Sequence, residues 1–362
     1  MSSVLVAMSG GVDSSLAAAI LTAAGHDVIG VTMKTFCYSE TTGRGKTCCG
    51  LDGIADAKRV AAALDIPHYV FDVEEAFTRD VIDDFVFEYA RGRTPNPCVR
   101  CNSNTKFRDL LARGKALGCD RIATGHYVRV EHGAGGSMLL RGSDTSKDQS
   151  YFLWGLPRDL LPRLLFPLGE LTKEEVRAQA RALGLVTADK PASQDICFVP
   201  TGDYRDLLKR RLGPIHAALE PGRIVRPGGD VVGTHRGYAG FTVGQRKGLG
   251  GGSSEPLFVL EIRPESREVV VGTREELFSD EVVVAGLNWL SDPPSPGTAV
   301  RVQLRYRAQL VEAVIEEVTE ELTLRLSEPQ AAVTPGQSAV LFAGARVLGG
   351  GLIVRAESLA LR

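Results

Sequence analysis

Short apolar runs alternate with helical patterns through the first half of the chain. Strands that alternate with helices in this way predict a parallel sheet covered by helices. A later helix has both ends marked, because Thr172 and Glu175 form the pattern of a capping box and Gly184 is placed to close it. The other predicted elements are strands at residues 4–8, 28–33, 68–72 and 121–124 and helices that end near Ala24 or span 52–64 and 104–117.

The pattern changes after about Leu212 to short β-branched runs separated by glycine and proline, which predict antiparallel strands. From about Asp280 a last set of strands suits a small barrel. We therefore expect three domains, at residues 1–212, 213–278 and 279–362. The predicted strands are residues 223–225, 230–232, 258–262 and 269–271, followed by 282–285, 299–306, 311–315, 322–326, 339–342 and 352–354.

Composition narrows the class of protein but not its partner. The chain has 362 residues, 44% of them hydrophobic and 24% charged, which describes a globular protein too long for one core. Its N-terminus lacks the pattern of a secretory signal and no apolar run is long enough for a membrane-spanning helix, so we expect a cytoplasmic protein. The net charge of −2 gives no overall sign of a nucleic-acid partner, although a local basic stripe would suffice for one.

The strongest chemical signal is the stretch Ser9-Gly10-Gly11-Val12-Asp13-Ser14, between a predicted strand and a predicted helix. Glycines let the backbone approach an anion closely, and hydroxyls and the N–H groups of a helix N-terminus donate to phosphate. The stretch lacks the Gly-Lys-Ser/Thr ending of a Walker loop and the third glycine of the dinucleotide fingerprint. It therefore predicts a pyrophosphate site of another type, and the alternative is a glycine-rich turn without function.

This loop resembles that of the PP-loop ATP pyrophosphatases, which have a Rossmann-like domain. The resemblance implies cleavage of ATP between its α and β phosphates and adenylation of a substrate oxygen. Several reaction types share the loop, among them thiolation and amide synthesis, so other motifs must decide the substrate.

A second signal is the pair Cys98 and Cys101 in the stretch 94–102, where the prolines predict a stiff loop and no helix. Cys101 precedes a helical pattern and has Arg100 and Lys106 nearby, which favours the reactive thiolate. Buried structural cysteines, a metal site and redox chemistry are the alternatives.

A third signal is Cys197, within the turn-like stretch 193–198. Together with Cys101 it offers a nucleophile and a sulfur carrier, while the first domain offers adenylation. These are the parts of a thiolation reaction.

The chain as a whole resembles the bacterial tRNA-specific 2-thiouridylases, which modify the wobble uridine of the anticodon. The resemblance covers nearly the whole chain. It rests on residues 9–14, 92–97, 123–127, 147–153, 195–198, 244–249 and 334–339.

The resemblance also implies roles for individual residues. Cys101 would be the nucleophile and Cys197 the persulfide carrier. ATP would be bound by Ala7, Met8, Ser9, Gly10, Gly11, Val12, Asp13, Ser14, Met33 and Gly125. The target base would lie against Asn96, Pro97 and Cys98, and the tRNA would contact His126, Lys147, Asp148, Gln149, Arg305, Tyr306 and Gln337. An open alternative for Arg301, Arg305 and Arg307 is the solvated face of a strand.

The implied reaction is an attack of the uridine C2 oxygen on the α-phosphate of ATP, followed by replacement of AMP with sulfur. Mg²⁺ would accompany ATP, and a sulfur carrier protein or a cysteine desulfurase would supply the persulfide. A [4Fe–4S] cluster on Cys98, Cys101 and Cys197 is the alternative, because Cys98 stands where some members of the family have an aspartate. Rival functions are those of another PP-loop tRNA thiolase, of an amide-forming synthetase and of a non-catalytic RNA-binding protein.

Seven cysteines in a reducing compartment suggest free, catalytic or metal-bound thiols rather than disulfides. Cys37, Cys48, Cys49 and Cys119 have no assigned role. A monomer is compatible with the sequence, which leaves the oligomeric state open.

Overall fold

The computed structural model describes residues 2–35, 51–133, 135–191, 196–199, 202–249, 255–356 and 358. The chain forms two compact units, each assembled from separate stretches. Unit 1 comprises Met1–Ile82, Cys98–Gly202 and Ala345–Val347, and unit 2 comprises Asp83–Pro97, Asp203–Gly344 and Leu348–Arg362. Residues 83–97 thus belong to unit 2 although the chain before and after them belongs to unit 1. The hydrophobic pattern of the sequence has no break that predicts this excursion.

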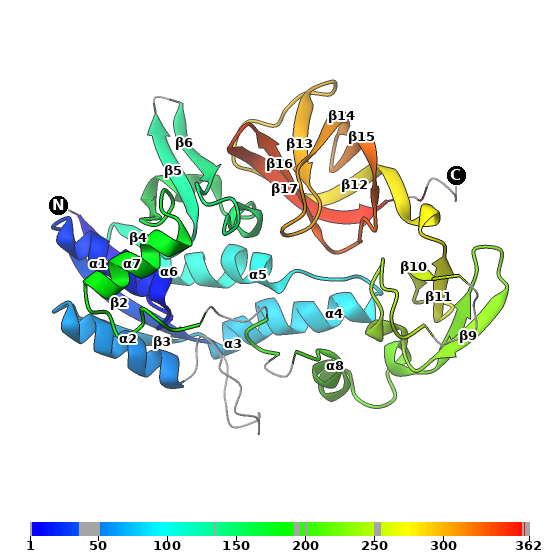
Figure 1. Ribbon diagram of the computed structural model, residues 1–362, viewed down its shortest axis with the longest axis horizontal. Coiled ribbons are helices and arrows are strands. Elements are labelled where there is room, and N and C mark those ends of the chain that lie inside the picture. The colour runs from blue at the N-terminus through cyan, green and yellow to red at the C-terminus, as the bar shows by residue number, and fades with distance from the viewer. Residues whose placement is uncertain are drawn as a thin grey trace. The chain divides into compact units, whose positions relative to one another are not determined.

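Unit 1 is built on a five-stranded parallel sheet with the order β3-β2-β1-β4-β7 (Figure 1). β1 pairs in parallel with both β2 and β4, so the chain reverses its direction of winding at β1. Ligands of open parallel sheets bind at the carboxyl ends of the strands on either side of such a reversal. The strands are β1 (Ser3–Ala7), β2 (Asp27–Lys34), β3 (His68–Asp72), β4 (Arg121–Thr124) and β7 (Leu164–Leu165).

Helices cover both faces of this sheet, as the alternation of side chains along β1 requires. Val4 and Val6 share one buried cluster with residues of α1, α2 and α7. Leu5 points to the opposite face, where Gly114 of α6 packs against its side chain. The main helices of unit 1 are α1 (Val12–Ala23), α2 (Leu51–Ala63), α3 (Glu74–Phe77), α5 (Pro97–Arg100), α6 (Phe107–Ala116) and α7 (Lys173–Ala182), with π-helical turns at Thr78–Asp83 and Cys101–Lys106.

The predicted strands and helices of this region are confirmed to within a few residues, and so is the capping box of α7. The Thr172 hydroxyl accepts from the Glu175 N–H, and the Glu175 carboxylate accepts from the Thr172 N–H. A hairpin of β5 (Val128–Gly133) and β6 (Gly136–Arg141) was not predicted. Glycines at 133, 135 and 136 mark its turn in the sequence and were the available signal.

Unit 2 contains a four-stranded sheet with the order β10-β11-β8-β9. The prediction of purely antiparallel strands here is wrong, because β11 and β8 run in parallel. Alternating apolar residues do not distinguish the two directions, which depend on the connection between the strands. The elements are α4 (Asp84–Ala90), α8 (Arg205–Leu212), β8 (Gly222–Val225), β9 (Val231–His235), β10 (Phe258–Arg263) and β11 (Glu268–Gly272).

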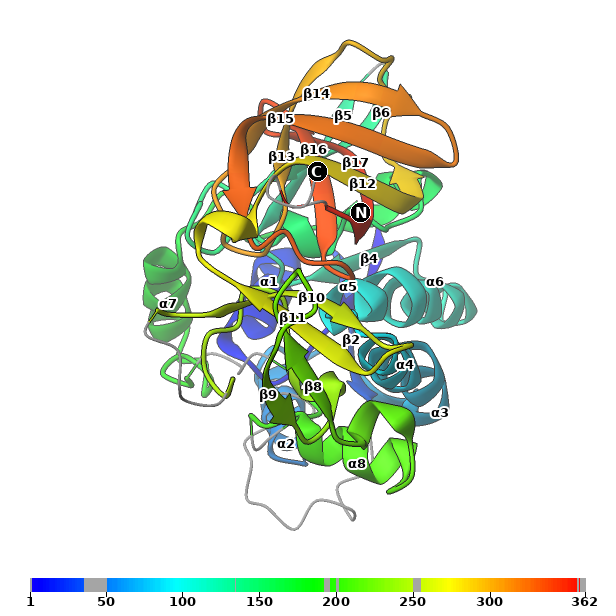
Figure 2. The same ribbon diagram turned by 90° about the vertical axis from the view of Figure 1, so that its right-hand side faces the viewer.

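Residues 278–355 form a closed six-stranded barrel, which belongs to unit 2 except for Ala345–Val347 and is seen from two directions in Figures 1 and 2. The strand order is β12-β15-β14-β13-β16-β17, and β17 pairs back with β12. Alternate residues point inward, so that Val284, Ile315 and Leu324 meet in one buried cluster. The strands are β12 (Phe278–Trp289), β13 (Ala299–Gln303), β14 (Val311–Val318), β15 (Glu321–Ala331), β16 (Ser338–Ala343) and β17 (Arg346–Arg355).

Short 3₁₀ turns connect these elements. None of the helices in the described part of the chain is both long and apolar enough to span a membrane. The 3₁₀ turns are Ser150–Phe152, Arg158–Arg163, Ala217–Leu219, Tyr238–Gly240 and Glu275–Leu277.

Candidate active site

The predicted phosphate loop lies where β1 ends and α1 begins, at the point where the sheet reverses its winding. Gly10 has a φ of +72°, and a methyl group there would lie 2.1 Å from the carbonyl oxygen of Gly53. Gly11 is the N-cap of α1 and has no side chain with which to cap the first N–H groups of that helix. These N–H groups and the helix dipole favour a phosphate, so the loop fits the triphosphate of ATP.

Gly125 brings the end of β4 against the start of α1. A Cβ atom on Gly125 would lie 2.7 Å from both the carbonyl carbon of Asp13 and the amide nitrogen of Ser14. Ser14 is itself buried, and its hydroxyl accepts from the N–H of Ser9 over 3.1 Å. The two chain segments that flank the reversal of the sheet therefore meet at the predicted ATP site.

Asp13 binds two side chains that the sequence did not single out. The ammonium group of Lys173 and the hydroxyl of Tyr127 both donate to Asp13 Oδ1, over 2.5 Å and 2.7 Å. Burial and the neighbouring Asp13 carboxylate raise the pKa of Tyr127. Tyr127 therefore stays a neutral hydrogen-bond donor. Lys173 places a positive charge at this loop, as the lysine of a Walker loop does in other nucleotide-binding proteins.

Lys190 holds the loop from its other side. Its ammonium group donates to the carbonyl of Gly10 over 2.8 Å and forms an ion pair of 2.5 Å with Asp56 of α2. Lys173 and Lys190 follow the loop by more than 150 residues and belong to no recognisable spacing. The fold alone brings them together.

Three other residues predicted to bind ATP belong to the strands that lead to this edge. Ala7 ends β1, and the N–H of Met8 continues the pairing by donating to the carbonyl of Val31 over 2.7 Å. Met33 is buried near the carboxyl end of β2. All of the predicted ATP residues thus lie at or near the carboxyl edge of the sheet, while their contact with ATP stays a prediction.

Cys98 and Cys101 lie on helical turns and not in a loop, so that the prediction of a non-helical stretch is wrong. The chain is helical from Pro97 through Ala116, first as α5, then as a π-helical turn and then as α6. A proline is tolerated in the first helical position, because its missing N–H group would have no partner there. Both half-buried thiols therefore lie at the N-terminal end of a helical run.

The π-helical turn that begins at Cys101 has an unusually polar interior. Asn102 and Thr105 are buried, with only 4% and 1% of their surfaces exposed. Asn102 Oδ1 and Thr105 Oγ1 have no hydrogen-bond partner in the part of the chain that the structure describes. Such groups are costly in a merely structural helix, and π-helical turns are frequent at functional sites.

Cys197 lies in a turn of unit 1, the unit that also contains Cys101. It is half-buried, and the neighbouring Phe198 packs edge-on against Phe77 with a centroid distance of 5.9 Å. Residues 193–195 of the predicted motif lie outside the described residues. Neither a role as sulfur carrier nor its alternative is tested by this placement.

The three thiols do not form a metal site in this structure. Among the described residues, no group of three or more Cys, His, Asp or Glu side chains is arranged to hold a metal ion. The geometry therefore gives no support to the cluster on Cys98, Cys101 and Cys197. Cys119 is buried, and this burial raises the pKa of its thiol, as expected of a structural cysteine. Cys37, Cys48 and Cys49 lie outside the described residues.

His126 and Gln149, both predicted to contact tRNA, keep partial exposure and also make internal contacts, so their contact with tRNA stays a prediction. His126 accepts from or donates to Thr124 Oγ1 over 2.7 Å and packs between Phe107 and Phe166. Although the ring keeps partial exposure, desolvation holds the pKa of His126 well below its ordinary value, so it is neutral near pH 7. The Gln149 side-chain oxygen accepts from the N–H of Tyr127 over 3.0 Å.

Asp148 is buried and its carboxylate accepts several internal hydrogen bonds, whereas Lys147 keeps partial exposure. The Asp148 carboxylate accepts from Arg141 Nε over 2.7 Å, from the Gly142 N–H and from both the N–H and the hydroxyl of Ser150. These bonds fix the chain on either side of Lys147. A contact between Lys147 and a phosphate remains a prediction.

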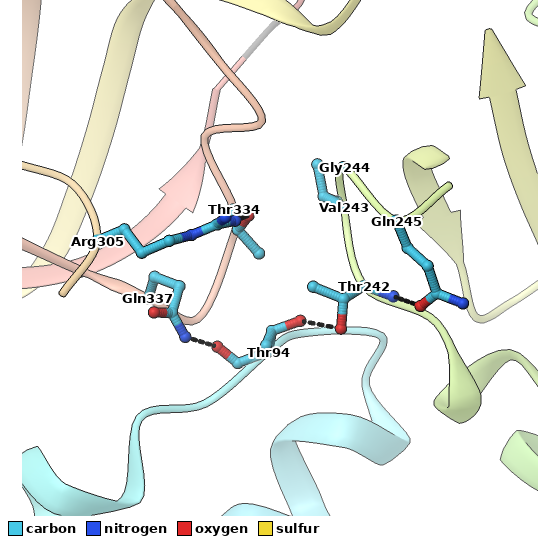
Figure 3. A pocket seen from close by; sticks show the side chains of 8 residues that line it. All are labelled: Thr94, Thr242, Val243, Gly244, Gln245, Arg305, Thr334 and Gln337. Atoms are coloured by element: carbon cyan, nitrogen blue, oxygen red, sulfur yellow. Dashed lines mark hydrogen bonds between the residues drawn. The ribbon is translucent and has the colours of Figure 1, made fainter. Parts of the chain in front are cut away.

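In unit 2 two of the residues predicted to contact tRNA, Arg305 and Gln337, line a pocket of about 300 Å³, shown in Figure 3. Arg305 lines it, and its guanidinium donates to Thr334 Oγ1 over 3.0 Å. Tyr306 follows and has the guanidinium of Arg307 5.2 Å above its ring. The pocket is lined by Thr94, Thr242, Val243, Gly244, Gln245, Arg305, Thr334 and Gln337.

The stretch predicted to hold the target base follows Thr94 directly. Pro95 and Pro97 are buried and Asn96 is half-buried between them. Gln337, for which a contact with tRNA stays a prediction, donates from its side-chain amide to the carbonyl of Thr94 over 2.8 Å. The pocket and two of the residues predicted to hold the base, Asn96 and Pro97, therefore belong to the same unit.

Comparison with family models covers most of the chain. Residues 2–201 match a model described as a tRNA methyl transferase HUP domain. Residues 206–273 match a tRNA methyl transferase PRC-barrel domain, and residues 279–353 match an aminomethyltransferase beta-barrel domain.

Individual relatives agree over nearly the full length. The chain is 48% identical over 98% of its length to the tRNA-specific 2-thiouridylase MnmA of Rhodospirillum centenum, covering 92% of that protein. It is 48% identical over 97% of its length to the protein of that name from Carboxydothermus hydrogenoformans, covering 97% of it. The same identity holds over 98% of the chain for the Acidithiobacillus ferrooxidans protein, again covering 98% of the relative. The chain therefore belongs to the tRNA-specific 2-thiouridylase family.

Proposed function

We propose that this protein uses ATP to replace the C2 oxygen of the tRNA wobble uridine with sulfur. The observation that carries the proposal is end-to-end membership of a family whose relatives are named tRNA-specific 2-thiouridylases. The phosphate loop and the thiols of unit 1 supply the chemical groups that such a reaction needs.

The first step is adenylation of the base. The uridine C2 oxygen attacks the α-phosphorus of ATP, a new P–O bond forms, the bond to the β-phosphate breaks and pyrophosphate leaves. Ser9 to Ser14 and Gly125 hold the phosphates, while Lys173 neutralises charge that builds up on them. The phosphates held by Ser9 to Ser14 would carry Mg²⁺, which would shield the negative charge of their oxygens.

The second step is sulfur transfer. The terminal sulfur of a persulfide on Cys197 attacks C2, and the C2–O bond breaks so that AMP leaves with the former base oxygen. The Cys101 thiolate then attacks the Cys197 sulfur, which releases the thiocarbonyl product and leaves a disulfide between the two cysteines. An external dithiol reduces this disulfide, and a sulfur carrier protein or a cysteine desulfurase reloads Cys197.

The helical start of Pro97–Arg100 supports Cys101 as the nucleophile, since a helix N-terminus stabilises a nearby thiolate. The polar groups of Asn102 and Thr105 beside Cys101 fit a site that receives a polar substrate. The [4Fe–4S] alternative uses the same Cys101 and Cys197 and differs from the relay in needing Cys98.

For tRNA binding we propose the basic and aromatic side chains of Lys147, Arg305 and Tyr306, which suit phosphates and an unstacked base. Because tRNA is the substrate, we place the protein in the cytoplasm. The three domains at residues 1–212, 213–278 and 279–362 serve as the functional division.

Product analysis tests the proposal. Purified protein, ATP, Mg²⁺, unmodified tRNA and a persulfide donor should yield AMP, pyrophosphate and 2-thiouridine in equal amounts, measured by liquid chromatography and mass spectrometry. Asp13→Ala should abolish all three products, whereas the exposed Asp159→Ala is the control and should retain them. Pyrophosphate release at the normal rate from Asp13→Ala would contradict the role of the loop.

Methyl transfer, named in the descriptions of two family models, is the second candidate. It requires a methyl donor and releases neither AMP nor pyrophosphate. A methylated nucleoside formed without ATP cleavage would favour it.

A further inference from the structure

We propose that the barrel turn Thr334–Gln337 positions the base-binding loop, and that Gln337 and Gly336 are positioning residues for thiolation. The expected effect on thiolation rests on the proposed function, whereas the contact between the turn and the loop does not depend on it. It assigns the barrel a second task besides holding RNA. The loop in question is Gly92–Pro97, which leads directly to Cys98.

The turn itself is rigid. The N–H of Gln337 donates to the carbonyl of Thr334 over 3.1 Å, and Gly336 between them has a φ of +90°. Pro335 followed by a glycine with positive φ is the signature of a type II turn. Two further bonds tie the turn to β17, from the N–H of Gly336 to the carbonyl of Ile353 and from the N–H of Ile353 to the carbonyl of Gln337, each 2.8 Å.

The turn grips the backbone of the loop by three hydrogen bonds. The N–H of Thr94 donates to the carbonyl of Pro335 over 2.9 Å. The side-chain amide of Gln337 donates to the carbonyl of Thr94 over 2.8 Å (Figure 3). It also donates to the carbonyl of Pro95 over 3.4 Å. The loop lacks the N–H groups of two prolines and cannot form a regular element of its own, so these bonds define its path.

Glycine is required at position 336 by this contact as well as by its φ. A Cβ atom there would lie 2.9 Å from both the nitrogen and the oxygen of Thr94, and 3.0 Å from Arg93 Cβ. The turn therefore lies directly against the loop backbone. Any side chain at position 336 would push Thr94 away.

Other contacts hold the start of the loop, whereas the turn holds the end of the loop. Arg93 forms a 2.5 Å ion pair with Glu88, whose side chain is only 6% exposed. A methyl group on Gly92 would lie 2.8 Å from Ile262 Cγ2. Thr94 Oγ1 also donates to Thr242 Oγ1 over 3.3 Å. Beyond Thr94, the Gln337 amide donates a hydrogen bond to the carbonyl of Pro95, next to Asn96.

The hydrogen bonds of the Gln337 amide distinguish a role in positioning the loop from a role in direct contact with RNA. A residue that recognises RNA through its amide would present the N–H groups outward, but here they point to the two loop carbonyls. Removing this amide should displace Asn96 and the segment that leads to Cys98. A misplacement of about 1 Å at a reacting group costs about 100-fold in rate, so the effect belongs to turnover and not to RNA affinity.

The test compares matched pairs of variants. Gln337→Met removes the amide without adding charge, and Gln330→Met is its control, because that amide only reaches the nearby Glu328 carbonyl. Gly336→Ala is paired with Gly344→Ala, which has a similarly positive φ of +60° and open space around it. We expect Gln337→Met and Gly336→Ala to lower the kcat of thiolation by about 10- to 100-fold. The Kd for tRNA should change by less than about threefold, and the controls should match the parent protein.

Hydrogen exchange gives a readout that does not depend on thiolation. Amides of the peptide that contains Thr94 and Asn96 should exchange faster in Gln337→Met than in Gln330→Met. A rise in Kd with unchanged kcat would overturn the proposal in favour of direct RNA contact, and so would unchanged exchange in this peptide. Absence of thiolation by the parent protein would instead refute the proposed function and leave the exchange result as the test of the turn.

Discussion

Replacing Gly125 with alanine tests whether close contact between β4 and α1 shapes the ATP site. The backbone of Gly125 does not have a positive φ, so alanine is penalised only by its methyl group. That group would lie 2.7 Å from atoms of Asp13 and Ser14, about 0.8 Å closer than an ordinary contact. Both sides are backbone, and β1 and β4 are hydrogen-bonded to each other, so neither can turn aside as a side chain would.

Overpacking of this kind costs about 1–3 kcal/mol. If that strain displaces the N–H groups that bind phosphate, kcat/KM for ATP should fall by about 5- to 150-fold. Pyrophosphate release at varied ATP concentration measures the effect, and thermal unfolding monitors the fold. Gly133→Ala is the matched control, because a methyl group there meets nothing within 4 Å. Equal values of kcat/KM for the two variants would refute the close approach as a feature of the ATP site.

Three other changes have definite expected outcomes. Lys173→Met should slow pyrophosphate release by about tenfold, since a charged bond to Asp13 contributes about 1.5–3 kcal/mol before screening reduces it, whereas the exposed Lys115→Met should not. Cys98→Ser should retain thiolation if the persulfide relay operates, whereas loss of both activity and about four bound irons would establish the cluster. Lowering the pH from 7 to 5 should reduce the free energy of unfolding, because burial depresses the pKa of His126, and also those of His68 and His235, so that the unfolded chain then binds more protons. His126→Phe should flatten this dependence in denaturant titrations, and an unchanged slope would contradict the assignment.

The nucleotide half of the fold could be predicted because its signals are local. The apolar run of β1, the glycines of the loop and the start of α1 are contiguous in the sequence, and each specifies its own backbone geometry. The capping box at Thr172 and Glu175 was predictable for the same reason. Strand direction was not, because the parallel pairing of β8 and β11 depends on the path of the chain between them.

The long-range partners of the site could not be predicted from one sequence. Lys173 and Lys190 reach the loop only because distant segments of the chain pack together. In the sequence, the residues next to these two lysines do not distinguish them from lysines on the surface. The prolines at 95 and 97 led to the wrong prediction of a loop without a helix. They exclude the interior of a helix but permit its first residue, which is where the structure places Pro97.

If the C2 oxygen of uridine itself attacks ATP, this oxygen leaves with AMP, and an isotope label can follow its transfer. An anticodon stem–loop RNA with ¹⁸O at C2 of the wobble uridine would be thiolated in unlabelled water, and the AMP analysed by mass spectrometry. Attack by the C2 oxygen predicts one ¹⁸O atom in the phosphate of AMP for each 2-thiouridine formed. AMP without ¹⁸O, formed together with 2-thiouridine, would contradict it.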